Sequence, residues 1–236
     1  MSFHILDKAE ERTYPFMKNK KKIILQLAIA IIGVFVALFG LVKFNQYVLM
    51  GIPLYPRIIV MILTQWLLFL VPGILMIIAK EKISGLGFTF KHLGRQILIG
   101  IVLALLLSAF LTILPILLGF KDMVGSTNYT KAWQYAYQFA YSILGVAVAE
   151  ELIFRGYIFH KLLELRNNRW FAIVISSLVF GLFHVFTGNL IQIFLTALLG
   201  FLFCLCREKI KNCSLLSLII LHGVYDALIV LWVGIL

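Results

Sequence analysis

The sequence predicts an all-α fold, a polytopic transmembrane helical bundle of about seven spans. Hydrophobic residues make up 62% of the chain and charged residues only 13%, with a mean hydropathy of +1.03. Soluble domains are about half apolar and a quarter charged. Apolar runs recur along the whole chain, and most approach the roughly 20 residues that cross a hydrocarbon core. The charged residues gather between these runs, as expected of an integral membrane protein.

Seven apolar runs bounded by charges or turn residues predict the helices in order. Pro72 and Pro115 fall inside runs, where neighbouring helices re-satisfy the carbonyls that a proline frees. The connection Thr187-Gly188-Asn189 is short and uncharged, so we expect it to lie below the membrane surface, packed against protein. The predicted helices are 23–43, 57–79, 96–119, 133–163, 170–186, 189–206 and 213–235.

The chain has room for one bundle and no second folded domain. Residues 1–22 are polar and of mixed charge, which predicts an N-terminal tail in the cytoplasm. The run that follows is longer than the core of a signal peptide and lacks a small-residue cleavage site, so it is interpreted as a retained first span. We divide the chain into the tail 1–22, N-terminal spans 23–131 and a helical core 132–236 that carries the candidate catalytic residues.

The positive charge indicates membrane orientation and not nucleic-acid binding. The net charge is +11, but the basic residues lie in short connections and not on a solvated face. In a seven-span arrangement, sixteen lysines and arginines fall on one side and only Lys43, Arg57, Lys121 and Lys131 on the other. Lysine and arginine mark the cytoplasmic side. We therefore expect a multi-pass protein of a plasma membrane, with its N-terminus in the cytoplasm and the lipid bilayer as its environment.

Ionisable side chains interrupt three of the later apolar runs. Ionised groups inside the bilayer are costly unless they are paired or face a polar cavity, so such residues mark candidate functional sites. Helix geometry allows the three runs to bring these residues to a similar depth. Glu151 and Arg155 are four residues apart and share a helix face, as do His222 and Asp226. The candidates are Glu150, Glu151, Arg155, His184, His222 and Asp226.

These residue types suit hydrolysis of a peptide bond. A glutamate in a low-dielectric site acts as a general base on water, with a histidine sharing the proton. A second histidine stabilises the oxyanion of the intermediate. Alternatively, Glu150, His184 and His222 bind Zn²⁺ and leave a position open for water. Purely structural roles also remain open, because an intramembrane ion pair or a core histidine can simply join helices.

The usual signatures of other hydrolases are absent from the sequence. No H-E-x-x-H helix and no G-x-S-x-G turn occurs. The three cysteines, Cys204, Cys206 and Cys213, show neither a disulfide framework nor a paired zinc pattern. We therefore predict no obligatory cofactor, with Zn²⁺ as the alternative.

Three motifs on separate predicted spans resemble the CPBP or Abi family, which contains the type II CAAX prenyl endopeptidases and relatives linked to bacteriocin immunity. The resemblance covers about residues 135–236, and the first three spans contribute no motif. The motifs are Glu-Glu-x-x-x-Arg (Glu150, Glu151, Arg155), Phe-x-x-x-His (Phe180, His184) and His-x-x-x-Asp (His222, Asp226).

The resemblance implies an intramembrane endopeptidase within an all-helical bundle. By that similarity Glu150 and His184 activate the hydrolytic water, while His222 and Asp226 form the oxyanion side. An asparagine would donate a hydrogen bond to an oxyanion, whereas an ionised Asp226 only accepts. Asp226 is therefore protonated, orients His222 or helps to hold a metal. The residues implied to brace the site are Glu151 and Arg155.

Two other functions compete with the protease. One is a non-catalytic bacteriocin self-immunity or regulatory membrane protein that retains the family scaffold. The other is a proton-coupled transporter that uses the same groups as a relay, although the sequence shows no inverted repeat. For the protease, the expected partner is a peptide or membrane-protein substrate. Because nearly every helix is apolar all round, the sequence favours no particular oligomer.

Overall fold

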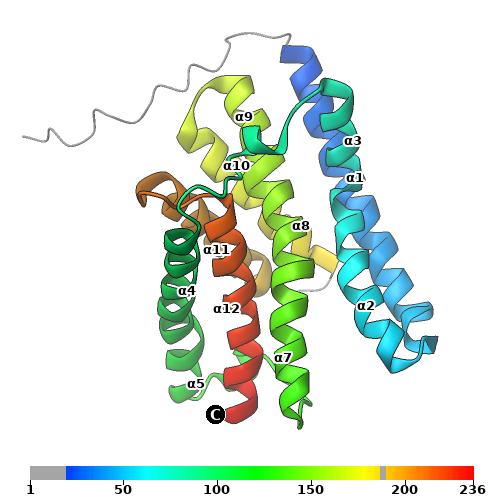
Figure 1. Ribbon diagram of the computed structural model, residues 1–236, viewed down its shortest axis with the longest axis vertical. Coiled ribbons are helices and arrows are strands. Elements are labelled where there is room, and N and C mark those ends of the chain that lie inside the picture. Colours follow the sequence, from blue (N-terminus) through cyan, green and yellow to red (C-terminus); the bar gives the residue numbers. More distant parts are fainter. Residues whose placement is uncertain (1–19, 187–189) are drawn as a thin grey trace, which may run out of the picture.

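The protein is described by a computed structural model for residues 20–186 and 190–236. Every regular element in these ranges is helical, which confirms the predicted fold class (Figure 1). The predicted connection Thr187-Gly188-Asn189 and most of the predicted tail 1–22 lie outside the described residues. In the described ranges the chain passes repeatedly along the long axis of the bundle, as a multi-pass membrane protein does (Figure 1).

Six helical segments of the described chain are long and apolar enough to cross a membrane. Each corresponds to one of the predicted runs. Four of them begin before the predicted run and two end after it, because helices continue into the polar residues that flank an apolar run. The six segments are Lys20–Gly51, Leu54–Ala79, Leu93–Leu117, Arg169–Phe186, Leu190–Lys209 and Leu215–Ile235.

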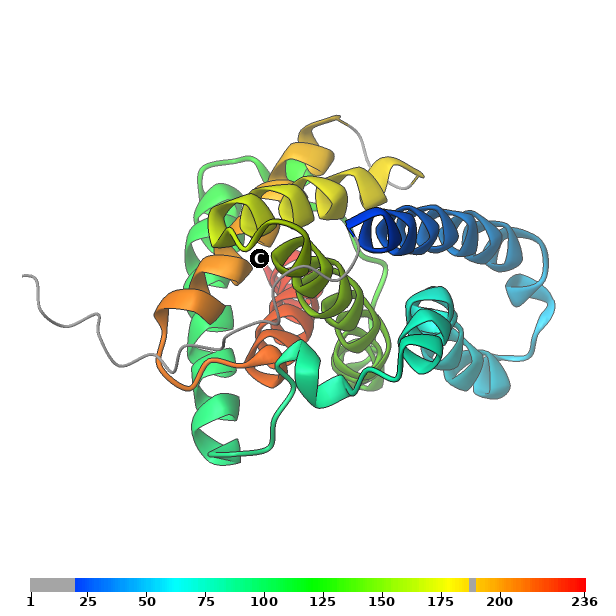
Figure 2. The same cartoon turned by 90° about the horizontal axis from the view of Figure 1, so that it is seen from above.

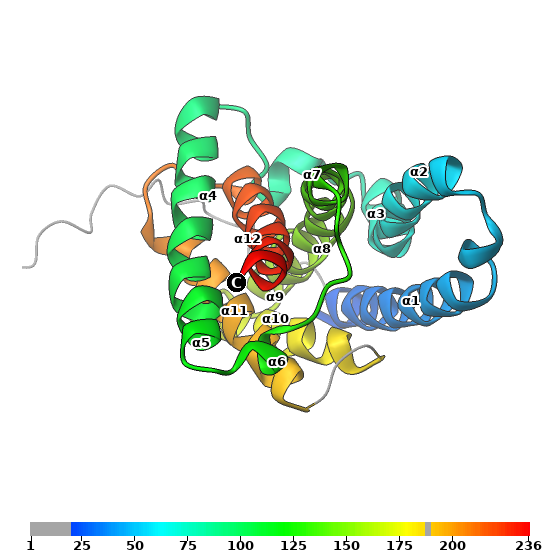
Figure 3. The same cartoon turned by 90° about the horizontal axis from the view of Figure 1, so that it is seen from below.

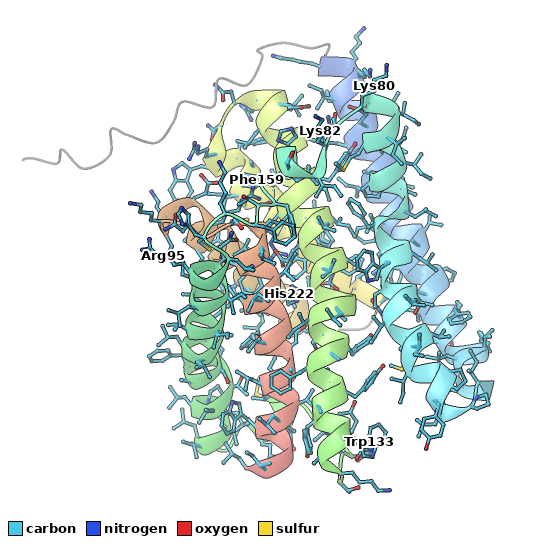
Figure 4. All side chains as sticks on the ribbon, in the orientation of Figure 1. Lys80, Lys82, Arg95, Trp133, Phe159 and His222 are labelled. Carbon is cyan, nitrogen blue, oxygen red and sulfur yellow. The ribbon has the colours of Figure 1, made fainter. Side chains whose placement is uncertain are left out.

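The predicted run 133–163 also forms helix, but it is not among those six. It is built from α7 (Ala132–Ala140), η5 (Tyr141–Ala147), α8 (Val148–Glu151), η6 (Leu152–Ile158) and α9 (Phe159–Arg166). Glutamines near its start and the charged cluster at its centre reduce its hydropathy. It nevertheless runs the length of the bundle, from Trp133 at one end towards Phe159 at the other (Figure 4).

Prolines inside spans follow turns that are not α-helical. Pro72 lies in the first turn of α3 (Leu70–Ala79), directly after the 3₁₀ turn η2 (Trp66–Phe69) that ends α2 (Leu54–Gln65). Pro115 lies in α5 (Leu114–Leu117), directly after the π-helical turn η4 (Ala109–Ile113) that ends α4 (Leu93–Ser108). Proline removes a backbone donor and clashes with the preceding turn. The altered turns accommodate this change while the span continues.

The last helix, α12 (Leu215–Ile235), lies between its neighbours in the middle of one half of the bundle. Views along the bundle show α4 on one side of it and α7 and α8 on the other (Figures 2 and 3). Helices α10 (Arg169–Phe183) and α11 (Leu190–Lys209) pack against each other nearby. On the far side of α8, α1 (Lys20–Tyr47) packs with α3. The α8 segment therefore faces both halves of the bundle.

Small residues allow α12 to approach its neighbours closely. A Cβ atom on Gly223 would lie only 2.5 Å from the backbone Cα of Ile143 in η5. A Cβ on Gly100 of α4 would lie 2.8 Å from the backbone oxygen of Ser217. Such close helix contacts are typical of membrane bundles, where packing of small residues drives association. These two contacts fix the position of α12, and with it the position of His222.

Polar bonds join the same helices at other levels. The indole N–H of Trp232 donates to Ser108 Oγ at 2.7 Å, which joins α12 to α4. The amide of Gln65 donates to the Tyr141 hydroxyl at 2.9 Å, which joins α2 to η5. In Figure 4, Lys80, Lys82 and Arg95 lie at the end of the bundle opposite Trp133. The connections that the sequence analysis found to be rich in lysine and arginine lie at that end.

Candidate active site

Glu150 and Glu151 occupy a single α-helical turn between two π-helical segments. The turn is α8, and the flanking segments are η5 and η6. π-Helical turns are rare and occur frequently at functional sites, because the extra residue in each turn re-aims the side chains that follow. All the residues of α8 and η6 except Val148 are buried. This local geometry carries no recognisable signal in the sequence, and the periodicity analysis predicts an ordinary α-helix here.

The predicted ion pair between Glu151 and Arg155 is present and fully buried. Arg155 Nη1 donates to Glu151 Oε1 at 2.9 Å, and the two side chains are 1% and 0% exposed. The guanidinium carbon lies 4.0 Å from the ring centroid of Phe180 and 5.1 Å from that of Phe203. Arginine is attracted to aromatic faces, most strongly where water is excluded. The two rings and one carboxylate therefore hold the arginine.

His222 on α12 lies among three carboxylates. Its Nδ1 is 2.8 Å from Glu151 Oε1, the oxygen that also receives Arg155. Its Nε2 is 3.3 Å from Asp226 Oδ2 and 3.8 Å from Glu150 Oε2. The sequence predicts that the adjacent glutamates can serve different partners, because they point about 100° apart on a helix. In the structure Glu151 pairs with Arg155 and faces Nδ1 of His222, while Glu150 faces Nε2 of the same ring.

His184 lies beside this cluster, separated from His222 by the ring of Phe180. It begins the 3₁₀ turn η7 (His184–Phe186) after α10, and its Nδ1 is 3.0 Å from the backbone oxygen of Phe180. The Phe180 ring meets both imidazoles edge to face, at centroid distances of 5.1 Å to His184 and 6.0 Å to His222. His184 interacts electrostatically with Glu150. The structure therefore brings all six candidates to one region, where the Phe180 ring contacts both histidines.

Several buried polar atoms of the cluster have no hydrogen-bond partner among the described residues. Glu150 Oε2 is such an atom, on a side chain only 7% exposed. Burying an acceptor without a partner costs about 1 to 3 kcal/mol. Glu150 Oε2 can therefore accept a further hydrogen bond at a position next to the His222 ring. The other unpartnered atoms nearby are Glu151 Oε2, Arg155 Nη2 and the Tyr157 hydroxyl.

The alternative donor set for Zn²⁺ is Glu150, His184 and His222. Within the described residues, no group of three or more His, Cys, Asp or Glu side chains is placed to hold a metal ion. His222 Nδ1 faces Glu151 and His184 Nδ1 faces a backbone oxygen, which leaves Nε2 as the ring nitrogen that a metal would use. We derive no chemical step through a metal.

One further residue supports the site, and the sequence analysis did not select it. Arg207, at the end of α11, donates from Nη1 to the backbone oxygen of Arg155 and from Nη2 to that of Leu86 at 2.8 Å. In the sequence it is only one of the basic residues between two apolar runs.

The comparisons with known proteins agree with the motifs. Residues 132–228 match the protein family described as Type II CAAX prenyl endopeptidase Rce1-like. This range contains all six candidate residues. No curated protein and no solved structure matches the chain. The match supports the resemblance to the CPBP or Abi family and a protease at the level of the family. Residues 132–228 of this membrane protein are therefore similar to the Rce1-like type II CAAX prenyl endopeptidase family.

Proposed function

We propose that the protein is an intramembrane endopeptidase that hydrolyses a peptide bond with a water activated by Glu150 and His184. The observation that carries this proposal is Glu150 Oε2, a buried carboxylate oxygen that has no hydrogen-bond partner among the described residues. A general base must reach the proton that it removes, and an unoccupied acceptor in a low-dielectric site satisfies that need. His184 interacts electrostatically with Glu150 and shares the proton.

Glu151 and Arg155 orient His222 in this proposal. A carboxylate paired with an arginine only accepts hydrogen bonds, so His222 Nδ1 carries the hydrogen that lies between the two groups. This fixes the ring and leaves Nε2 facing Asp226 and Glu150. When His222 is protonated, its Nε2–H is a charged donor for the oxyanion that forms as water attacks the peptide carbonyl. Before the oxyanion forms, Asp226 accepts from this N–H and orients it.

The reaction balances with these residues alone. Glu150 takes a proton from water, and the oxygen bonds to the peptide carbonyl carbon. The tetrahedral intermediate then collapses, the carbon–nitrogen bond breaks, and the proton passes to the leaving amine. Arg155 supports the cluster by neutralising Glu151 and does not touch the reacting atoms.

We further propose that residues 132–236 form the catalytic core, that 23–131 form N-terminal membrane spans and that 1–22 form a cytoplasmic tail. The basic connections lie at one end of the bundle, which supports an N-terminus in the cytoplasm of a bacterial plasma membrane. The substrate is a peptide or a membrane-associated protein that approaches from this side. Its prenylation is not part of the proposal.

The experiment compares peptides by mass spectrometry in producing cells that carry wild type, Glu150→Gln or His184→Ala at matched membrane abundance. Glu208→Gln serves as a control, because Glu208 pairs with Arg169 outside the cluster. We expect a fragment that appears with wild type and the control and is absent with the two site variants. Identical peptide profiles in all four strains, with the cellular phenotype retained, would favour the non-catalytic immunity or regulatory function.

A further inference from the structure

A polar cavity lies at the basic end of the bundle, outside the glutamate–histidine cluster. It has a volume of about 610 Å³ and is formed by the connection before α4, the end of α11 and the connection before α12. None of the six candidate catalytic residues lines it. The residues that line it are Ser84, Gly87, Phe88, Thr89, Lys91, His92, Gln96, Arg207, Ile210, Asn212, Cys213 and Ser214.

The wall of this cavity is fixed by a buried glutamine. Gln96 is only 1% exposed, and its Nε2 donates to the backbone oxygens of Thr89 at 2.9 Å and Lys91 at 2.6 Å. Its Oε1 accepts a hydrogen bond from the hydroxyl of Ser214, the residue that caps α12. One side chain thus joins the loop before α4 to the start of α12. Lys91 is held at the rim by backbone contacts and does not depend on its own ammonium group for its position.

Arg207 lines the cavity directly beside Gly87. Gly87 has a φ of +85°, a conformation that glycine adopts without strain. A Cβ atom at this position would collide with the Arg207 guanidinium. Arg207 reaches past Gly87 to donate to the backbone oxygens of Leu86 and Arg155. The glycine therefore permits a guanidinium to form part of the cavity surface.

The chemistry of the lining favours an anion. Three of the lining side chains are cationic or become so on protonation, namely Lys91, His92 and Arg207, while no Asp or Glu of the described residues lines the cavity. Hydroxyl and amide groups of Ser84, Thr89 and Asn212 add neutral donors. The Lys91 ammonium makes no hydrogen bond or ion pair within ranges 20–186 and 190–236. Phosphate oxygens suit such a mixture of charged and neutral donors.

Apolar side chains border this cavity on the surface of the bundle. Phe90, between lining residues Thr89 and Lys91, is 68% exposed and packs edge to face against Phe88 at 5.1 Å. Further along α4, Leu93 and Leu98 are 45% and 61% exposed. A soluble anion has no apolar groups to place against this surface, whereas the acyl chains of a lipid would pack against it. Basic cavities at the cytoplasmic ends of membrane helices bind anionic headgroups.

We propose that this cavity binds the phosphate headgroup of an anionic phospholipid, with its acyl chains along α4. Lys91 and His92, whose side chains are exposed, contact the phosphate, and the half-buried Arg207 adds positive charge. Because Arg207 also donates to the backbone oxygen of Arg155, one side chain connects the cavity to η6, the segment that follows the two glutamates. The site is independent of peptide hydrolysis, so the two proposals stand or fall separately.

The test is native mass spectrometry of the purified protein in neutral detergent, titrated with phosphatidylglycerol. Lys91→Glu is the test variant. Lys80→Glu is the matched control, because Lys80 is an exposed lysine at the same end of the bundle, at the end of α3, and does not line the cavity (Figure 4). Phosphatidylcholine and inorganic phosphate are the comparison ligands. A thermal-unfolding midpoint for each variant shows that the fold is intact.

We expect one phosphatidylglycerol to bind wild type and Lys80→Glu with similar affinity. Lys91→Glu changes the charge at the cavity by two units. At about 1 kcal/mol per unit charge, the affinity for phosphatidylglycerol falls roughly 25-fold. If the affinity for phosphatidylglycerol falls equally in Lys91→Glu and Lys80→Glu, the lipid is attracted to the basic end of the bundle as a whole and the proposed site is wrong. Phosphatidylcholine binding as tightly as phosphatidylglycerol would also overturn it. If inorganic phosphate binds as tightly as the lipid, the cavity takes a soluble anion and the lipid assignment is wrong.

Discussion

His222 Nδ1 and Arg155 Nη1 both contact one oxygen, Glu151 Oε1, at 2.8 Å and 2.9 Å. A single carboxylate thus links a residue of η6 to a residue of α12 while remaining fully buried. The i, i+4 spacing of Glu151 and Arg155 predicts their pair, but the long-range contact to His222 comes only from the fold. The shared oxygen makes the arginine a support for the histidine, and this has consequences that can be measured.

Breaking the buried pair should destabilise the protein more than removing both partners. Arg155→Met or Glu151→Gln alone leaves the other group buried without its partner, which costs about 3 to 5 kcal/mol. The double variant removes both charges, so its loss should be clearly less than the sum of the single losses. Reversible unfolding in detergent, followed for all four proteins, measures this coupling. Simple additivity would show that the two side chains do not act together.

Gly223→Ala should displace His222 and abolish activity, whereas Gly40→Ala should be neutral. The new Cβ at 223 would lie 2.5 Å from the Ile143 backbone, so α12 must move away from η5. At Gly40 of α1 nothing lies within 4 Å of the added atom. Both are glycine-to-alanine changes in helices, and therefore share the same propensity effect. Peptide-cleavage rates at equal membrane abundance compare them, and full activity of Gly223→Ala would contradict the packing described for α12.

Phe180→Leu should reduce activity while leaving the helical bundle folded. The Phe180 ring contacts His184, His222 and the Arg155 guanidinium. Leucine keeps much of the volume but loses the aromatic face, whose attraction to a desolvated cation is worth up to about 2 kcal/mol. The control is Phe194→Leu, because Phe194 is 68% exposed on α11. Cleavage rate and unfolding midpoint are measured together. Equal cleavage rates for Phe180→Leu and Phe194→Leu would show that the Phe180 ring does not contribute to the site.

The loss of stability in acid should depend in part on Glu164. Burial alone would raise the pKa of Glu164, but hydrogen bonds from His160 and Lys161 lower it from 4.5 to about 2. A carboxyl group with a depressed folded pKa contributes stability above its unfolded pKa, and the contribution is lost as the pH falls through the folded value. Glu164→Gln should therefore flatten the stability profile between about pH 4.5 and 2.

The control for this profile is Asp122→Asn, an exposed carboxylate on the short helix α6 (Lys121–Val124), outside the contacts of Lys161. Unfolding midpoints of wild type and both variants are recorded across this range. If Glu164→Gln retains the full acid dependence of wild type, the hydrogen bonds of His160 and Lys161 do not govern the titration.

Much of the fold follows from the sequence, because apolar runs of membrane length give the helices directly. The same rule places Glu150, Glu151, Arg155, His222 and Asp226 on two helices and predicts the pairs within each helix. It does not predict the π-helical segments around α8, since they arise from packing and not from a residue pattern. It also misses Arg207, whose role depends on Gly87 and on backbone oxygens that have no side-chain signature.

The central claim is that Glu150 activates water for peptide hydrolysis, and isotope labelling tests it most directly. Purified wild type or Glu150→Gln in lipid vesicles is incubated in ¹⁸O-water with a membrane extract of producing cells, and fragments are analysed by mass spectrometry. The account predicts fragments with ¹⁸O at a new C-terminal carboxylate for wild type, reduced by about 100-fold or more for Glu150→Gln. Labelled fragments of equal yield from both proteins, or none from either, would contradict it.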